Sequence, residues 1–361
     1  MLASVYFYFL VLNLLIITQK VDENDQLLGF FIEWLKRFSY KFEKITVLCL
    51  EKGQFDLPEN VKVFSMGKDS GASKIKQLST FYFLLFILRK DYDAVFVHMN
   101  PIWVVLGGTF WRLMNKKIFF WYTSGGITTK LKLAEKFAHT IFTASSESFR
   151  LPSKKIIVTG HGIDTEVFGP VTDIQPPATD NKIKILSVGR IAPVKNYEIL
   201  IDAAKILRDR SFNFSVTMIG EAPLDRDKQY LLNIKDKIKN LKLENYFVFT
   251  GKINHKDLPS FYQSHNIFVH LSKTGSLDKA LLEAMACGMQ VLSSNYSAKA
   301  FLAPQFLFDE DRADDLAFKL QLISEKHYQM KPEPSLRDYV VKNHNLDKLI
   351  DKISGIIAGF N

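Results

Sequence analysis

The stretch Ile185–Arg208 reads ILSVGRIAPVKNYEILIDAAKILR and contains one strand, one loop and one helix. Ile185–Gly189 is an apolar run that ends in glycine, which is typical of a buried strand with a tight exit. Tyr197–Arg208 has the apolar spacing of an amphipathic helix. The loop between them places Arg190 and Lys195 at the carboxyl edge of a sheet, near a helix N-terminus, where two cations can neutralise a diphosphate. The alternative is a pair of solvated cations beside a turn.

The same alternation of strand and helix patterns runs through the whole chain and predicts an α/β fold with parallel sheets. It is interrupted at Gly169–Asn181 (GPVTDIQPPATDN), which has no apolar period and which we interpret as an interdomain linker. A length of 361 residues also favours two domains. Besides Leu14–Thr18 and Ile185–Gly189, the expected strands are Ile45–Leu50, Ala94–His98, Ile118–Tyr122, Thr140–Thr143, Ile156–Val158, Ser215–Gly220, Phe247–Gly251, Ile267–Leu271, Val291–Ser293 and Phe306–Phe308.

The predicted architecture is two Rossmann-like, doubly wound parallel-sheet domains that face each other across a cleft. Such sheets bind ligands at the carboxyl ends of their strands. We assign residues 1–172 to an N-terminal domain and residues 173–345 to a C-terminal domain. In the remaining segment, 346–361, the helix expected at Leu346–Ala358 has an apolar stripe suited to packing back on the interface.

The beginning of the chain is almost wholly apolar over Met1–Thr18. No Lys or Arg precedes this run, and no small-x-small cleavage site ends it, so it lacks two features of a signal peptide. We interpret Leu14–Thr18 as the first buried strand of the sheet. Met1–Leu12 is either a weak membrane anchor or an artefact of start-site choice.

Charge and cysteine usage limit the classes of partner. The formal charge of +9 suits nucleic acid, acidic lipid or a phosphorylated substrate, but no aromatic and basic recognition motif supports nucleic acid. The only two cysteines, Cys49 and Cys287, form neither a disulfide framework nor a metal-binding spacing. They indicate a reducing, cytoplasmic setting.

A second loop and helix occur at Thr274–Gly288 (TGSLDKALLEAMACG), where Gly288 is expected to close the helix as its C′ residue. The small loop around Gly275 and Ser276 offers free backbone N–H groups to phosphate oxygens. Glu283 stands among Ala, Leu and Met in the helix. A ribose diol can donate two hydrogen bonds to such a carboxylate; the alternative is that Glu283 faces solvent or pairs with a cation.

The order, spacing and setting of these features resemble the retaining glycosyltransferases of family 4 (glycosyl transferases group 1), which have the GT-B fold. In that family the matching Arg and Lys hold the donor diphosphate and the matching Glu binds the ribose, so the resemblance implies these roles for Arg190, Lys195 and Glu283. It also brings Gly220, Glu221, Gly275 and Ser276 to the donor. The resemblance spans nearly the whole chain and rests on GHGID at Gly160–Asp164 followed by Phe168, VGR…K at Val188–Lys195, MIGE at Met218–Glu221, FTGKI at Phe249–Ile253 and LLEAMACG at Leu281–Gly288.

The sequence departs from the family pattern on the sugar side of the donor. The family has two glutamates separated by seven residues, and the first of them is Gly275 here. We expect Asp278 to contact the sugar hydroxyls instead, and Lys279 to contact a phosphate or a hydroxyl. The alternative is a helix N-cap at Ser276 or Asp278 beside a solvated lysine.

A second departure lies in the N-terminal domain, where Ser124 replaces a histidine that the family places close to the reacting sugar. His98, at the end of the preceding strand, is another candidate for a catalytic group in the cleft; the alternative is a satisfied strand-end histidine. Asp22, Glu23 and Asp25 occupy the usual acceptor loop, either as ligands of acceptor hydroxyls or as solvated residues. We discount the D-x-D pattern Asp91–Asp93 as a metal site because it precedes a strand.

The resemblance implies transfer of a hexose from a UDP- or GDP-sugar to a saccharide or lipid-linked hydroxyl, with retained configuration and neither metal nor cofactor. Cell-surface polysaccharide or glycolipid synthesis is the expected setting. A non-catalytic nucleotide-sugar-binding subunit, an epimerase and a phosphorylase are the alternatives. Leu28–Phe38 and Phe81–Arg89 combine aromatics with basic flanks and suit peripheral contact with anionic lipid on the inner face of the membrane. The alternative, which we prefer, is that both helices pack on the sheet.

Overall fold

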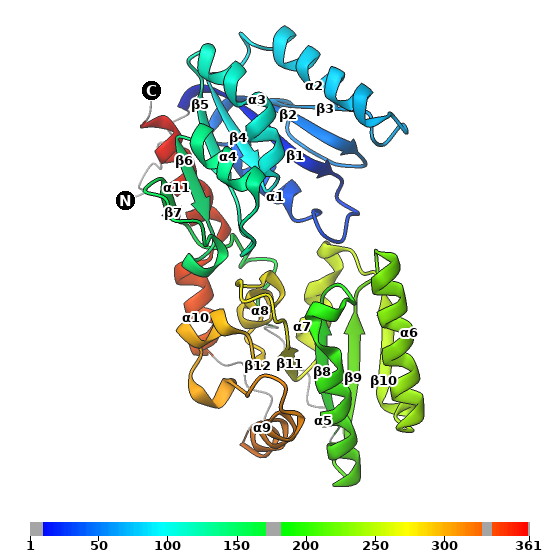
Figure 1. Ribbon diagram of the computed structural model, residues 1–361. Coiled ribbons are helices and arrows are strands. Elements are labelled where there is room, and N and C mark those ends of the chain that lie inside the picture. Colours follow the sequence, from blue (N-terminus) through cyan, green and yellow to red (C-terminus); the bar gives the residue numbers. More distant parts are fainter. Residues whose placement is uncertain (1–9, 171–181, 327–333, 360–361) are drawn as a thin grey trace, which may run out of the picture. The chain divides into compact units, whose positions relative to one another are not determined.

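The computed structural model describes residues 10–170, 182–326 and 334–359 (Figure 1). It divides into two units. The N-terminal unit contains the described residues up to Gly162, together with Asn254–Lys256 and the segment from Asn345 onward, and the C-terminal unit contains Ile163–Ile253 and Asp257–His344. The second unit therefore begins before the expected linker, of which residues 171–181 lie outside the described residues.

The N-terminal unit is built on a sheet of seven parallel strands in the order β3-β2-β1-β4-β5-β6-β7. The strand order reverses between β1 and β4, as in other doubly wound sheets. The strands are β1 (Leu10–Val21), β2 (Phe42–Lys52), β3 (Val61–Ser65), β4 (Ala94–His98), β5 (Lys117–Trp121), β6 (Thr140–Thr143) and β7 (Ile156–Val158).

The central strand β1 confirms the expectation for Leu14–Thr18, because the strand pairs on both sides and these residues are fully buried. Its start at Leu10 takes in the end of the apolar segment Met1–Leu12, whose residues 1–9 lie outside the described residues. The edge strand β3 was not expected from the sequence. Only its first residue, Val61, is fully buried, so the segment lacks the apolar run by which the central strands are recognised.

Helices cover both faces of this sheet (Figure 1). On one face α1 packs with the C-terminal helix α11, and on the other lie α2, α3 and α4. No helix in the described part of the chain is both long and apolar enough to cross a membrane. The bounds are α1 (Phe31–Ser39), α2 (Lys74–Ile87), α3 (Pro101–Leu113), α4 (Thr129–Phe137) and α11 (Leu346–Ala358).

The C-terminal unit has a second parallel sheet, of five strands in the order β10-β9-β8-β11-β12. Its order reverses between β8 and β11. The strands are β8 (Ile183–Val188), β9 (Phe214–Ile219), β10 (Phe247–Gly251), β11 (Ile267–His270) and β12 (Gln290–Ser293), and the helices are α5 (Tyr197–Asp209), α6 (Asp225–Asn240), α7 (Leu258–Ser264), α8 (Lys279–Ala286), α9 (Ala313–Lys326) and α10 (Pro334–Asn343).

The strand expected at Phe306–Phe308 is wrong. Pro304–Phe306 forms a short 3-10 turn, and only one bridge joins Leu307 to Ser293. Pro304 begins the turn; it has a fixed φ and no N–H to donate to a ladder.

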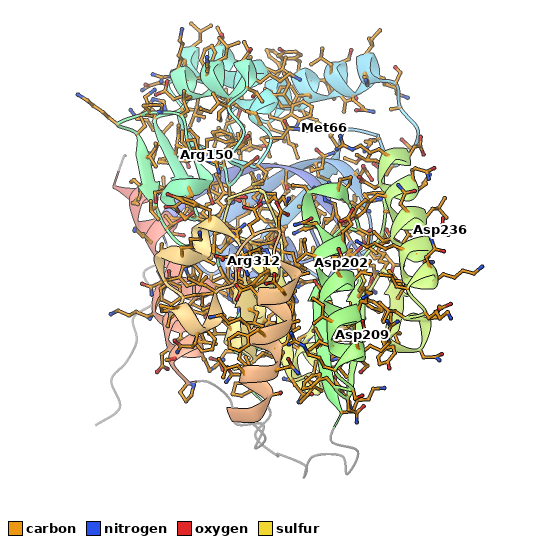
Figure 2. All side chains as sticks on the ribbon, turned by 60° about the horizontal axis from the view of Figure 1, so that its bottom comes forward. Met66, Arg150, Asp202, Asp209, Asp236 and Arg312 are labelled. Atoms are coloured by element: carbon orange, nitrogen blue, oxygen red, sulfur yellow. The ribbon has the colours of Figure 1, made fainter. Side chains whose placement is uncertain are left out.

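The helix expected after β8 is confirmed as α5, whose apolar stripe packs on the sheet together with α6 and α9. The opposite side of α5 carries Asp202 and Asp209, labelled in Figure 2, which pair with Lys237 at 2.7 Å and Lys205 at 2.9 Å. This separation of apolar and charged side chains explains why the helix could be recognised from its sequence.

Candidate functional site

The candidate site lies in the C-terminal unit where the strand order of the sheet reverses. The loop after β8 carries Arg190 and Lys195, and the loop after β11 leads through Gly275 and Ser276 into α8. β8 and β11 are parallel neighbours, so the loops that follow their carboxyl ends leave the sheet side by side. Open α/β sheets bind ligands at such a point.

Two glycines bring the backbones of β8 and β9 close together at this edge. Gly189 has φ +151° and Gly220 has φ +145°, both values that other residues rarely adopt. A Cβ on Gly220 would lie 1.9 Å from the carbonyl oxygen of Gly189. A Cβ on Gly189 would lie 3.2 Å from Cε of Lys195, so the lysine stem lies directly over the end of the strand.

Lys195 is held by the carboxylate of Asp278, across the junction between the two loops. Its ammonium forms an ion pair with Oδ2 of Asp278, and the two side chains are only 13% and 22% exposed. The same carboxylate oxygen lies 3.2 Å from Nε2 of His270, whose Nδ1 lies 3.1 Å from Oγ of Ser293. Asp278 thus joins the β8 loop to the ends of β11 and β12.

Because its carboxylate pairs with Lys195, Asp278 does not cap the helix that it precedes. Asp278 occupies the N-cap position of α8 with extended backbone angles, yet its side chain makes no capping hydrogen bond. Burial disfavours its charged form, but the charges of Lys195 and the hydrogen-bonded His270 outweigh burial and hold the pKa of Asp278 well below its usual range. The carboxylate is therefore ionised and directed at the lysine.

Glu283 and Lys279 form a second charged group one helical turn apart on α8. Glu283 is 3% exposed and accepts a 3.0 Å hydrogen bond from the hydroxyl of Tyr262. Burial lowers the pKa of Lys279 to about 8, although the nearby charges of Glu283 and Asp164 act in the opposite direction. Burial and the Glu283 charge raise the pKa of Tyr262, so its hydroxyl stays protonated and donates. Glu283 does not face bulk solvent, in contrast to one alternative considered above.

The loop before α8 is held by side-chain hydrogen bonds, and the N–H of Ser276, expected to be free, donates to Oγ1 of Thr274 at 3.4 Å. Gly275 adopts φ +64°, and its carbonyl accepts a 2.6 Å hydrogen bond from Oγ of Ser297. Oγ of Ser276 donates to Thr274 Oγ1 at 3.1 Å. Gly288 closes the helix at φ +76°, as expected for a C′ residue.

Arg190 and Glu221 are the exposed members of the site. Both follow directly on the glycines described above, and the carbonyl of Glu221 accepts a 2.8 Å hydrogen bond from the N–H of Ile191. The guanidinium of Arg190 forms no salt bridge with any residue that the structure describes. It is thus an accessible cation beside the buried ion pair.

The N-terminal unit places His98 inside its core. The ring is 1% exposed, stacks on Phe31 with centroids 4.1 Å apart, and has Nδ1 3.1 Å from Oγ1 of Thr18. His98 is therefore packed among aromatic side chains at the end of β4, where its ring also lies 5.9 Å from that of Trp34. Ser124, in the loop after β5, is half-buried.

Two of the three acidic residues after β1, Asp22 and Asp25, pair within their own segment, whereas Glu23 pairs with Lys256 at 3.8 Å. Lys20 pairs with Asp22 at 3.2 Å and with Asp25 at 3.0 Å. Oδ1 of Asp25 also accepts from the backbone N–H groups of residues 27 and 28. Asp93 belongs to the discounted D-x-D pattern and lies directly before β4, where its carboxylate accepts a hydrogen bond from the N–H of Asn13. Among the residues described, no cluster of three or more His, Cys, Asp or Glu is arranged to hold a metal ion.

Sequence reasoning missed three residues of the C-terminal site: His270, Ser293 and Tyr262. His270 and Ser293 end neighbouring strands of the sheet, so their positions at strand ends were an available signal. Tyr262 lies on α7, and nothing in the sequence pairs it with Glu283. Its contribution could be seen only from the structure.

The chain is similar in sequence to known glycosyltransferases. Residues 172–343 match the family model described as glycosyl transferases group 1. The chain is 31% identical over 150 residues to mannosylfructose-phosphate synthase of Agrobacterium fabrum, and 30% identical over 153 residues to the amylovoran biosynthesis glycosyltransferase AmsK of Erwinia amylovora. These matches cover 39% and 40% of this chain and only 33% and 35% of the two relatives.

The structural similarity extends over both units. Anabaena HepE, solved in complex with UDP and glucose, superposes with a TM-score of 0.76 at 17% identity, covering 96% of this chain and 99% of HepE. The fold is therefore GT-B, as expected, and the resemblance to group 1 glycosyltransferases is confirmed.

Proposed function

We propose that this protein is a retaining glycosyltransferase that moves a hexose from a UDP- or GDP-sugar to a hydroxyl acceptor. The observation that carries the proposal is the meeting of Arg190, Lys195 and the start of α8 at the point where the strand order reverses, in the unit that matches the glycosyltransferase family. That HepE was solved with UDP supports a nucleotide donor.

The donor's diphosphate would lie between Arg190, Lys195 and the amide groups at the start of α8. Lys279 stands at the first position of the same helix and adds a third cation to this edge. Glu283 would accept from the ribose diol, with Tyr262 holding one of its oxygens in place. Gly220 and Glu221 border the same loop. Because Gly220 has no side chain, the donor could approach the backbone closely there.

Asp278 has a proposed role in two stages. In the free protein it neutralises Lys195. When the diphosphate binds Lys195, the carboxylate is released and accepts from the sugar hydroxyls, as the glutamate absent at Gly275 would have done. Gly275 and Ser276 then contribute backbone N–H groups only.

The chemical step follows from the charge that develops on the leaving group. The bond between the anomeric carbon and the diphosphate oxygen breaks, the acceptor oxygen bonds to the same face of the sugar, and the acceptor proton passes to the departing phosphate. Arg190, Lys195 and Lys279 stabilise the diphosphate without a metal ion or cofactor. No nucleophilic side chain is required by this front-face route, and we assign no role in it to the buried His98.

The acceptor we propose is a saccharide or a lipid-linked saccharide in polysaccharide or glycolipid synthesis. AmsK, which matches this chain, is named for amylovoran biosynthesis, and this supports the setting. We place the reaction in the cytoplasm, with peripheral contact at the inner face of the membrane.

A panel of UDP- and GDP-hexoses tests the proposal by binding, donor hydrolysis and transfer, with and without a chelator. We expect saturable binding of one nucleotide class, turnover unaffected by the chelator, and a product with the donor's anomeric configuration by NMR. Binding without turnover over a broad acceptor panel would indicate a non-catalytic subunit. Interconversion of the sugar without acceptor would indicate an epimerase, and consumption of inorganic phosphate a phosphorylase. Failure to bind any nucleotide sugar overturns the proposal.

A further inference from the structure

Helix α2 (Lys74–Ile87) carries two apolar stripes where an ordinary surface helix carries one. The inner stripe, Phe81, Leu84 and Leu85, is buried against the sheet and α3, with the ring of Phe81 4.9 Å from that of Trp103. The outer stripe repeats at helical spacing on the opposite side and consists of Ile75, Leu78, Tyr82, Phe83, Phe86 and Ile87.

The outer stripe is open to solvent. Ile75 is 80% exposed, Phe83 61% and Phe86 58%. A helix that is apolar on all sides is normally buried on all sides, and a contiguous exposed apolar face marks an interaction surface. The other apolar segment considered above, α1, differs because Phe31, Trp34 and Phe38 are all buried. Only α2 therefore keeps the apolar face that the sequence offered for contact with lipid.

The charges on α2 and at its two ends are basic. The sequence of α2 contains no acidic residue, and Lys74 and Lys76 begin the helix while Arg89 and Lys90 follow its end. Arg89 lies over the ring of Phe86, 4.3 Å from its centroid, so a cation sits directly beside the apolar stripe. From Ala72 to Phe137 the sequence has ten basic and three acidic residues, a net +7 of the chain's +9.

We propose that the outer face of α2 docks on the surface of a lipid bilayer that contains anionic lipid. An amphipathic face with basic rims fits the boundary between acyl chains and headgroups, where the apolar side chains insert and the cations meet lipid phosphates. A second copy of this chain fits less well, because two such faces would bring cations of the same sign together. The orientation of α2 is fixed by its buried stripe and by the hydroxyl of Tyr82, which donates to the carbonyl of Leu106 at 3.1 Å.

This inference deepens the proposed function, since a membrane-bound enzyme can reach a lipid-linked acceptor, but its test needs no catalysis. The full chain is sedimented with phosphatidylcholine vesicles prepared with or without phosphatidylglycerol. We expect binding only to the anionic vesicles, with a loss of affinity as salt is raised. Each basic residue near the surface contributes roughly fivefold to the affinity, so Lys74→Glu with Lys76→Glu is expected to reduce binding at least tenfold.

Phe83→Glu with Phe86→Glu tests the apolar contribution and should also reduce vesicle binding at least tenfold. The matched control is Phe318→Glu on α9 of the C-terminal unit, where the ring is 55% exposed and binding should not change. Unchanged thermal melting shows that the substitutions at these exposed positions leave the fold intact.

Phe86→Trp provides a second measurement, because the four native tryptophans are at most 6% exposed. Its emission should shift to the blue on anionic vesicles and be quenched by brominated lipid. Equal binding by the double Phe variant and wild type, or no binding to anionic vesicles at low salt, overturns the proposal. So does a dimer in solution that disappears in the double variant, which would make a second copy the occupant.

Discussion

The Lys195–Asp278 ion pair leads to a prediction that separates nucleotide binding from sugar transfer. In the proposed function, the donor diphosphate must displace Asp278 from Lys195. The ammonium of Lys195 keeps its charge in Asp278→Asn, so the variant retains a hydrogen bond to the amide oxygen and loses the attraction between two opposite charges, a difference of up to about 1 kcal/mol for an exposed pair. The two side chains are less than a third exposed, so screening by solvent is weaker than for an exposed pair. We take about 1–1.4 kcal/mol, and therefore expect Asp278→Asn to bind UDP or GDP roughly five- to tenfold more tightly.

The same substitution is expected to reduce transfer, since the carboxylate is lost from the sugar hydroxyls. Removing one well-placed polar contact to a transition state typically lowers kcat by about a hundredfold. Calorimetric titration with the nucleoside diphosphate and the intact donor measures the first effect, and initial rates measure the second.

Asp202→Asn is the matched control. Asp202 pairs with Lys237 at 2.7 Å on the outer side of α5, and its side chain is 40% exposed, so both affinity and rate should remain at wild-type values. Weaker or unchanged diphosphate binding by Asp278→Asn would refute the competition between Asp278 and the donor. Tighter binding with an unchanged rate would leave the ion pair as described and remove the contact with the sugar.

Three further predictions concern the same edge of the sheet. Because the guanidinium of Arg190 is exposed, Arg190→Ala is expected to lower the association rate of the diphosphate and the salt dependence of that rate. Lys195→Ala should mainly raise the dissociation rate. If stopped-flow measurements show unchanged rates for either variant, that residue does not belong to the site. The pKa of Lys279 is about 8, so the ammonium loses its charge as pH rises through that value, and diphosphate affinity should fall over the same range. Arginine stays charged over this range, so the diphosphate affinity of Lys279→Arg should not change near pH 8. A fall in affinity at this pH in the variant would contradict the assignment of the titration to Lys279. Gly220→Ala places a Cβ 1.9 Å from a carbonyl oxygen and should cost at least about 2 kcal/mol of unfolding free energy, so a wild-type Tm would show that the two backbones are further apart than described.

The parts of the fold that could be predicted from the sequence are those in which burial leaves a periodic pattern. The helix after β8 and the final helix α11 each have one apolar and one charged face, and the central strand β1 contains the apolar run Leu14–Ile17. The edge strand β3 has no such run. The short apolar segment Phe306–Phe308, which comes just after Pro304, was wrongly expected to be a strand because strand and turn are alike over three residues.

The charged site was predicted residue by residue but not contact by contact. Sequence order indicated that Lys195 and Asp278 belong to one site, and a ligand was assigned to each. Their pairing with each other depends on the adjacency of β8 and β11, which are 82 residues apart in hydrogen-bonded contacts such as Ser187 to Val269. Periodicity carries no information about such a distance, and the same reason accounts for His270 and Tyr262.

The pairing changes how the absence of a glutamate at Gly275 should be interpreted. A carboxylate is still present at this edge, three residues further on, at a helix N-cap where it makes no capping bond. Because it neutralises Lys195, the exposed guanidinium of Arg190 is the member of the Arg190 and Lys195 couple that an approaching anion can reach. In the proposed function, the donor would meet Arg190 first and take Lys195 by exchange, so that the carboxylate of Asp278 would become available to the sugar only when the diphosphate is already bound. The substitution at Gly275 would thereby couple sugar recognition to nucleotide binding, which a fixed glutamate in the loop would not do.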